Sequence, residues 1–265
     1  MTMKKTLRIT GIVFSIILMM LIVMLLSPFI FKEKFAQIIK STANKTLRTE
    51  VNFSEMDISF FHHFPKLTIT LYDFTLKSSP PFAKDTLIKA RDISFGINLK
   101  SIFRGPLKIT GVYLNKARII LQYNEKGASN FDIYKSSSDS TESKDTTSST
   151  GAGAAIKIKH IAFIQTDFIY SDPSIPLKLV AHGINYSGHS LLTNDILKLN
   201  SRVKIDSFDL YYNHIPYLKS KPIKADLATT INLKSLNIKL DKNDLVIKNI
   251  PFEFKGELAF KKDGY

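Results

Sequence analysis

The sequence predicts a mainly β protein in which an N-terminal transmembrane helix and a short amphipathic helix precede a mostly antiparallel β-sheet. Three observations lead to this fold class. An uncharged apolar run near the N-terminus is followed by a segment with helical spacing, and beyond about residue 50 apolar and polar residues alternate. Of the 265 residues, 44% are hydrophobic, which is enough for a sizeable core.

The apolar run covers residues 9–31 without a charged residue, and a helix of that length can cross a hydrocarbon layer about 30 Å thick. A cleaved signal peptide would have a shorter apolar region, of about 7–15 residues, followed by small residues at the cleavage site. Here Ser27 and Pro28 are followed by aromatic and aliphatic residues, so the sequence favours an uncleaved anchor. The residues expected within this anchor include Ile12, Phe14, Ile17, Leu21 and Leu25.

Basic residues are concentrated beside the apolar run. Lys4, Lys5 and Arg8 precede it, and the positive-inside bias therefore places residues 1–8 in the cytoplasm. The bulk of the chain would then lie in a periplasm or a lumen. The net charge of +14 also suits nucleic acid, but no cluster of Lys and Arg is interleaved with aromatic residues. We therefore expect the basic residues to contact the inner membrane and not nucleic acid.

A short amphipathic helix is predicted just after the anchor, ending near Lys45. Apolar or small side chains recur there at helical spacing: Phe31, Phe35, Ile38, Ile39 and Thr42. This helix could continue the anchor, lie along the membrane surface or pack onto the β body, and the sequence does not choose between these arrangements.

Strands follow at roughly ten-residue spacing, with turn residues between them. The run at 92–99 is typical, because Ile93, Phe95, Ile97 and Leu99 alternate with polar residues. Further runs occur at 67–71, 119–123, 203–205, 208–212, 227–233, 236–240, 245–247, 252–254 and 257–260, and turns are expected at 77–81, 104–106, 125–127 and 241–244. A meander of short strands is the expected arrangement.

One segment interrupts the alternation. Residues 136–155 are mostly Ser, Thr, Asp, Gly and Ala, with almost no apolar content beyond alanine, so they are predicted to form a disordered loop. The segment could separate two domains or be an insertion in one continuous sheet, and the similar pattern on both sides favours the insertion. At the other end, residues 261–265 resemble a turn that opens another strand, so a longer parent protein is expected.

Residue patterns that carry chemistry are missing. The chain contains no cysteine, which excludes disulfides, thiolate metal sites and a cysteine nucleophile. It also lacks a phosphate-binding glycine loop, a His-Glu-x-x-His motif and a Gly-x-Ser-x-Gly motif. His62 and His63 form the only close histidine pair, and adjacent residues of a strand point to opposite faces. We therefore expect no catalytic residues, no metal ligands and no cofactor.

Several segments match a known family in order. Thr46-Leu47-Arg48 precedes a strand, where the family often has Thr-Gly-Arg with a glycine that is absent here. A proline-led strand starts at Phe64-Pro65, an alternating strand covers 90–99, and Arg104-Gly105-Pro106 leads into a further strand. The turn at 125–132 contains Gly127 and Asn130-Phe131. Together with the anchor, these segments resemble the AsmA-like family of Gram-negative envelope proteins, from the anchor to about Tyr134.

The resemblance implies a curved, open β-groove with an apolar inside that carries phospholipid or another acyl lipid between the inner and outer membranes. It implies a single-pass protein of the inner (cytoplasmic) membrane with its bulk in the periplasm. The expected organisation is a cytoplasmic N-terminus at 1–8, an anchor at 9–31, an AsmA-like β region at 32–135, a disordered loop at 136–155 and a continuing groove at 156–265. The candidate groove residues are Leu67, Ile69, Leu71, Ile93, Phe95, Ile97, Leu99, Ile119 and Leu121.

Alternatives remain for both structure and function. Two packed sheets could replace the open groove, and each candidate residue could be ordinary core. An anchored structural or assembly factor that binds envelope proteins is the second functional hypothesis. An anchored hydrolase is the third, because a site assembled by the fold is invisible in the sequence.

Overall fold

The computed structural model describes residues 15–16, 18–19, 32–63, 66–98, 108–134, 155–193, 195–233, 235 and 237–258. Within these ranges a helix, α2 (Lys32–Thr46), precedes eleven strands. The strands are β1 (Val51–Asn52), β2 (Glu55–His63), β3 (Lys66–Lys77), β4 (Thr86–Ile97), β5 (Lys108–Gln122), β6 (Ala155–Asp172), β7 (Leu177–Thr193), β8 (Ile196–Tyr212), β9 (Ile215–Asn232), β10 (Ile238–Ile247) and β11 (Ile250–Leu258).

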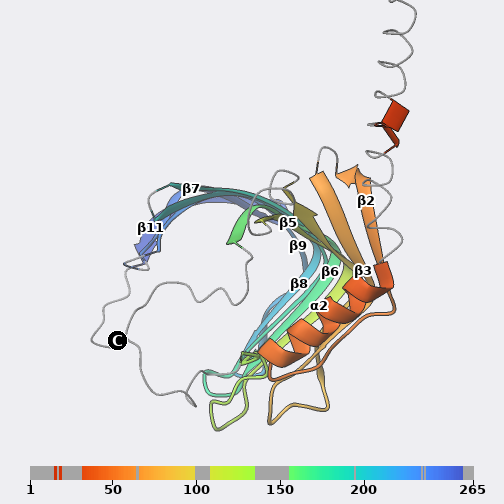
Figure 1. Cartoon of the computed structure of the whole chain (residues 1–265). Helices are drawn as coiled ribbons and strands as arrows, with labels where there is room; N and C mark the ends of the chain where they lie inside the picture. Colours follow the sequence, from red (N-terminus) through yellow and green to blue (C-terminus); the bar gives the residue numbers. More distant parts are fainter. Residues whose placement is uncertain are drawn as a thin grey trace, which may run out of the picture.

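All eleven strands belong to one sheet that curves into an open arch (Figure 1). The order is β1-β3-β4-β5-β6-β7-β8-β9-β10-β11, and β2 also pairs with β3. Every pairing is antiparallel except that of β5 with β6. The predicted mainly β, mostly antiparallel and open sheet is therefore confirmed, and the alternative of two packed sheets is not found in the described residues.

The parallel pairing of β5 with β6 explains the polar interruption in the sequence. Two parallel neighbours need a long connection, because the chain must return to the edge from which it left. The predicted loop at 136–155 lies in this connection, and its residues 136–154 fall outside the described residues. Strand pairing continues directly from β5 to β6, so the strands on both sides form one sheet.

The prediction of short strands about ten residues apart is wrong for the second half, where β6 to β9 are 17 or 18 residues long. The separate runs predicted at 203–205 and 208–212 are both part of β8. The register shifts between Ile205 and Phe208, which marks a bulge. The turn predicted at 241–244 lies inside β10 for the same reason, since the register there shifts between Leu240 and Lys242.

A line of irregular residues crosses the sheet at one level. Asp73 in β3, Lys116 in β5 and Gln165 in β6 adopt left-handed backbone conformations, with φ of 50°, 47° and 50°. The residue pairs that flank these positions in the strand register place Asp73 opposite Arg91 of β4 and Arg91 opposite Lys116. They also place Lys116 beside Gln165. Non-glycine residues rarely adopt such φ values, so the backbone is irregular at this level although the register from β3 to β6 does not shift there. We call these four residues the crease.

The α2 helix packs against the first strands of the sheet. Its Ala36, Ile39 and Ala43 recur at helical spacing and contact the core cluster, which includes Phe53 and Met56. The helix predicted at 32–45 is thus present, and among the open alternatives it packs onto the β body. Of the residues that suggested it, only Ile39 has a described side chain.

The predicted membrane anchor lies almost entirely outside the described residues. Only 15–16 and 18–19 of the predicted 9–31 span are described, and they are helical. In the part of the chain that the structure describes, no helix combines the length and apolar character needed to cross a bilayer.

Candidate functional site

One face of the sheet is apolar from the first strands to the last. Directly paired residues lie on the same face, so the register identifies which side chains share it. We call this face the apolar face, and one row of successive partners from β2 to β11 shows its composition. This central row consists of Met56, Leu71, Ile93, Leu114, Phe163, Tyr186, Val203, Ala225, Leu245 and Phe252.

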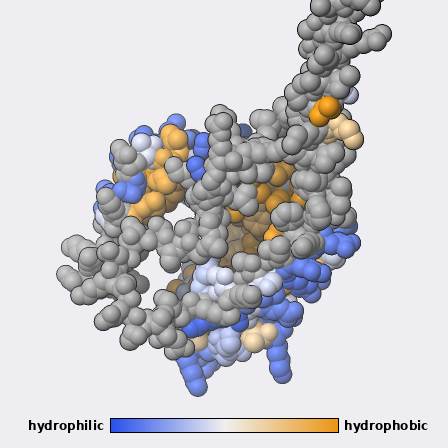
Figure 2. All heavy atoms as spheres, in the orientation of Figure 1, coloured by the Kyte–Doolittle hydropathy of each residue, from blue (hydrophilic) through white to orange (hydrophobic). Residues whose placement is uncertain are grey.

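The apolar face lines the hollow of the arch. Figure 2 shows hydrophobic residues gathered on the inner side, with hydrophilic residues on the outer rim. Rows parallel to the central row are also rich in apolar side chains, such as Ile119, Phe168, Ala181 and Phe208 at successive pairings. The hollow is therefore a groove with an apolar lining that runs across the strands.

Burial of the apolar face decreases from the N-terminal strands toward the C-terminal ones. Met56 and Leu71 are each 3% exposed, whereas Phe252 is 45% and Ile250 60% exposed. All nine residues of β11 are exposed. The face is therefore a covered core at one end and an open surface at the other.

The covered end has two covering elements. The first is α2, described above. The second is the turn after β5, whose Phe131 and Ile133 pack against the same core cluster. Over β6 to β11, the described residues include no comparable element, and we call this uncovered part of the apolar face the open groove.

Hydrogen bonds hold the covering elements in place. The Asn44 side chain accepts a hydrogen bond from the Val51 backbone N–H at 2.7 Å and donates one to the Val51 carbonyl at 3.3 Å. Arg48 pairs with Asp132 at 2.8 Å, and its backbone N–H donates to the Ile133 carbonyl. The end of α2 is therefore attached both to β1 and to the second covering element.

The groove residues predicted from the sequence lie together on the apolar face, but at its covered end. Leu67, Leu71, Ile93 and Ile97 are buried at 3–8% exposure as members of the core cluster. Ile69, Phe95, Ile119 and Leu121 are partly buried and pack against that cluster, and Leu99 lies outside the described residues.

The more exposed apolar residues belong to strands that sequence reasoning did not select. Val203, Leu245, Phe252 and Phe254 lie on β8, β10 and β11. Their alternation was visible in the sequence. Their exposure was not visible in the sequence, because it depends on the absence of a covering helix above them.

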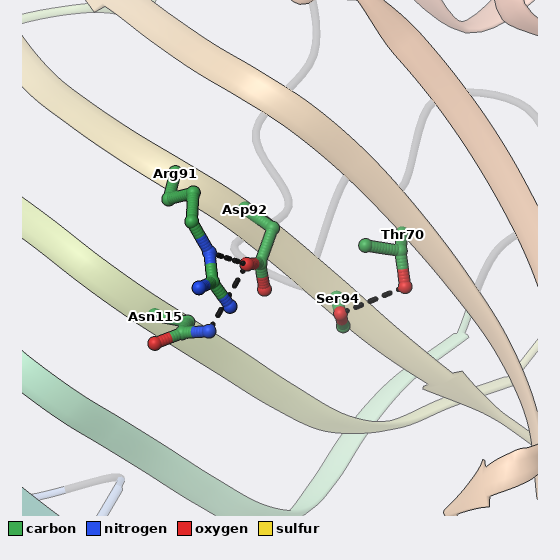
Figure 3. Close-up of polar contacts among 5 residues, drawn as sticks. All are labelled: Thr70, Arg91, Asp92, Ser94 and Asn115. Carbon is green, nitrogen blue, oxygen red and sulfur yellow. Dashed lines mark hydrogen bonds and ion pairs between the residues drawn. The ribbon is translucent and has the colours of Figure 1, made fainter.

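The outer face near β3 to β5 is polar. Thr70 and Ser94 share a buried hydrogen bond of 2.9 Å between their hydroxyl groups. Asp92 accepts hydrogen bonds from Arg91 Nε at 3.0 Å and from Asn115 Nδ2 at 3.1 Å (Figure 3). Burial raises the pKa of the neighbouring Tyr72, and the carboxylates of Asp57 and Asp92 raise it further.

Aromatic rings line one end of the apolar face. Tyr123 makes edge contacts with Phe131 and Tyr170 at centroid distances of 5.2 and 6.3 Å. The Tyr170 hydroxyl donates to Asp172, and burial together with this carboxylate raises the Tyr170 pKa. Each of the two tyrosine rings combines an apolar body with a polar hydroxyl, as suits the end of an apolar groove that meets water.

No metal-binding cluster is found among the described residues. No set of three or more His, Asp or Glu side chains there could hold a metal ion. His160 and His189 are cross-strand neighbours with ring centroids 4.7 Å apart, a contact that the sequence did not predict. The side chains of His62 and His63 lie outside the described part.

Comparison with known proteins gives one match. The model of the AsmA family matches residues 3–208. Neither the curated proteins nor the solved structures include a significant match to the chain.

Proposed function

Because the chain belongs to the AsmA family of envelope proteins, we propose that it is a membrane-anchored periplasmic protein that binds or conducts phospholipid along its open groove. In this proposal residues 9–31 form a single span in the inner membrane. The groove accepts the acyl chains of lipid on their way between the inner and outer membranes, and the protein thereby supports outer-membrane homeostasis. No catalysis is assigned to it.

The observation that carries the proposal is the uncovered apolar face over β6 to β11. A one-sided apolar sheet in water needs a cover, which can be another sheet, a helix or lipid. Moving one methylene group from water onto such a surface contributes about 0.8 kcal/mol, so an acyl chain is a well-matched cover. The row that ends in Val203, Ala225, Leu245 and Phe252 crosses four strands without a charged side chain.

The test uses the full chain purified in mild detergent. We expect Val203→Glu combined with Leu245→Glu to reduce co-purifying phospholipid at least about tenfold, because two charges on the apolar face must be desolvated by a bound acyl chain. Phospholipid is quantified by mass spectrometry. The control is Asn200→Glu combined with Thr230→Glu, which adds the same charges on the opposite face of β8 and β9 and should leave the lipid content unchanged.

Circular dichroism separates loss of lipid binding from loss of the fold. The proposal requires that the groove variant keeps its β signal while losing lipid. Equal phospholipid contents in the groove variant, the control and the parent protein would contradict it.

A structural or assembly factor is the second candidate, favoured by the edge of the sheet at β11. Among the described residues β11 pairs only with β10, so its other edge can accept a strand from a partner protein. A photoreactive residue in place of Phe254, which faces the groove, tests both candidates. Cross-links to lipid support the groove proposal, and cross-links to an envelope protein without lipid support the second.

A further inference from the structure

Four basic side chains form a two-by-two cluster at the crease. Lys89 and Arg91 lie on β4, and Lys116 and Arg118 lie on β5. Lys89 is directly paired with Arg118, and the flanking pairs place Arg91 opposite Lys116. All four residues are exposed. We call them the basic quartet.

The arrangement concentrates positive charge. Neighbouring strands are about 4.8 Å apart, and like charges directly opposite each other destabilise a sheet. The quartet contains two such pairs side by side. An anion placed among the four side chains would replace this repulsion with attraction.

The carboxylates beside the quartet interact with other donors. Asp73 accepts a hydrogen bond of 2.7 Å from the Ser54 hydroxyl. Asp167 lies 3.3 Å from His182 Nδ1 and accepts a hydrogen bond of 3.2 Å from the Gly183 backbone N–H.

Three of the four basic side chains of the quartet lack a partner among the described residues. Arg91 pairs with Asp92 (Figure 3). Within the described part of the chain, Lys89, Lys116 and Arg118 have no ion pair or hydrogen-bond partner for their side chains. Three cationic groups are therefore available to a ligand at one place.

A depression of about 440 Å³ lies at the quartet. Besides the four cations it is lined by Asp73, Gln165 and Asp167, with Ala90 and Ala117 as the small residues between them. The carboxylates offer acceptors for hydroxyl groups next to an anionic centre.

From the register, the unpaired cations and the depression, we infer that the basic quartet is a binding site for a phosphate group. Arginine provides a planar fork of donors for phosphate oxygens, and lysine provides point charges. The site lies on the face of the sheet opposite to the groove. It is therefore independent of the proposed lipid function.

Titration calorimetry on the full chain in neutral detergent tests the site with two soluble probes. Inorganic phosphate represents free phosphate, and glycerophosphoglycerol represents a lipid headgroup without acyl chains. We expect at least one probe to bind, and Lys116→Gln combined with Arg118→Gln to weaken its affinity at least about tenfold, because two charge-assisted contacts are lost. Tighter binding of phosphate assigns the site to free phosphate, and tighter binding of glycerophosphoglycerol assigns it to a headgroup.

The control is Lys178→Gln combined with Lys198→Gln, which removes two exposed lysines of β7 and β8 outside the depression. The control should bind both probes as the parent protein does. Should the double variant of the quartet fail to fold, Lys89→Gln alone provides the comparison. The inference is overturned if neither probe binds at millimolar concentration, or if the quartet and control variants have the same affinity. Phospholipid content reports the groove separately and should not change in either variant.

Discussion

At the scale of single residues, asparagine side chains replace missing strand partners. Asn130 is fully buried, and its amide accepts a hydrogen bond from the Gln122 backbone N–H at 2.9 Å. It donates to the Ile120 carbonyl at 2.8 Å and to the Ser78 hydroxyl at 3.2 Å. Asn44 makes the equivalent pair of bonds to Val51. In both places a side-chain amide satisfies backbone groups that lack a ladder partner.

Asn130→Ala should therefore be strongly destabilising. The substitution leaves the part-buried Gln122 N–H and Ile120 carbonyl without these partners, at a cost of about 2–3 kcal/mol in the free energy of unfolding. Denaturant unfolding followed by circular dichroism measures the loss. Asn249→Ala, at an exposed turn, is the matched control and should change stability by less than about 0.5 kcal/mol. Equal effects of the two substitutions would contradict this role for Asn130.

Asp172 makes the stability of the β6–β7 turn depend on pH. A hydrogen bond of 2.6 Å from the Ser174 hydroxyl is the main cause that lowers the Asp172 pKa from its ordinary value of 3.8. A carboxyl with a lowered pKa stabilises the folded state at pH values above its ordinary pKa. This contribution is lost as the pH falls through the lowered pKa. Ser174→Ala should therefore be more destabilising at pH 7 than at acid pH.

The measurement for Ser174→Ala is the midpoint of thermal unfolding at pH 7 and below pH 3.8. The difference in unfolding midpoint between the variant and the parent protein should be smaller at the lower pH. Ser220, an exposed residue of β9, provides a control as Ser220→Ala. A difference that stays constant with pH would show that the Ser174 hydroxyl acts without involving the Asp172 charge.

At the scale of elements, α2 decides which part of the apolar face is a core. Its contacts come from one stripe of small and aliphatic residues, and Lys40 Nζ lies 5.6 Å from the centre of the Phe53 ring. Ile39→Ala should weaken the packing of this helix, at a cost of about 1–2 kcal/mol for a half-buried aliphatic side chain. It should also increase the fluorescence of a dye that binds exposed apolar surface.

Gln37→Ala is the matched control, since Gln37 is exposed on the same helix. The control should change neither the unfolding free energy nor the dye fluorescence. If Ile39→Ala leaves both measurements at the parent values, α2 does not act as the cover of β1 to β5.

The sequence predicted element types better than element limits. Alternation identified strands at Ile93 and Phe252, and helical spacing identified α2. The alternation of apolar and polar residues gave wrong strand limits wherever a bulge inserted a residue, as before Phe208. A bulge and a turn interrupt this alternation in the same way, so the sequence does not distinguish them. The parallel pairing across the 135–154 segment could not be predicted, since it depends on residues distant in the chain.

The groove residues selected from the sequence lie on the apolar face, but at its covered end. Leu71 and Ile93 alternate as clearly as Val203 and Leu245 do, so periodicity assigns all four to one side of the sheet. Periodicity does not show that α2 covers the first pair. The basic quartet was missed for a similar reason, because Lys89 and Arg118 become neighbours only through the register of β4 with β5.

At the scale of the whole molecule, the arch combines a rigid end with an open one, and amide hydrogen exchange can measure this asymmetry. Strands with a covered apolar face open rarely, whereas strands with few buried contacts exchange through local opening. We expect amides of β3 and β4 to exchange at least about tenfold more slowly than those of β10 and β11 in the delipidated full chain. Equal rates in the two regions would contradict a division of the sheet into core and groove.

Phospholipid should then protect the open end selectively. In the proposed function, acyl chains in the open groove would bury Val203, Leu245 and Phe252. Exchange in β8 to β11 should therefore slow after lipid is added, while β3 and β4 change little. Val203→Glu combined with Leu245→Glu should abolish this protection without altering exchange in β3 and β4. Uniform protection of the whole sheet would instead indicate a general stabilising effect of lipid. Since the response depends on position along the arch, it distinguishes an acyl chain in the groove from lipid bound elsewhere on the protein.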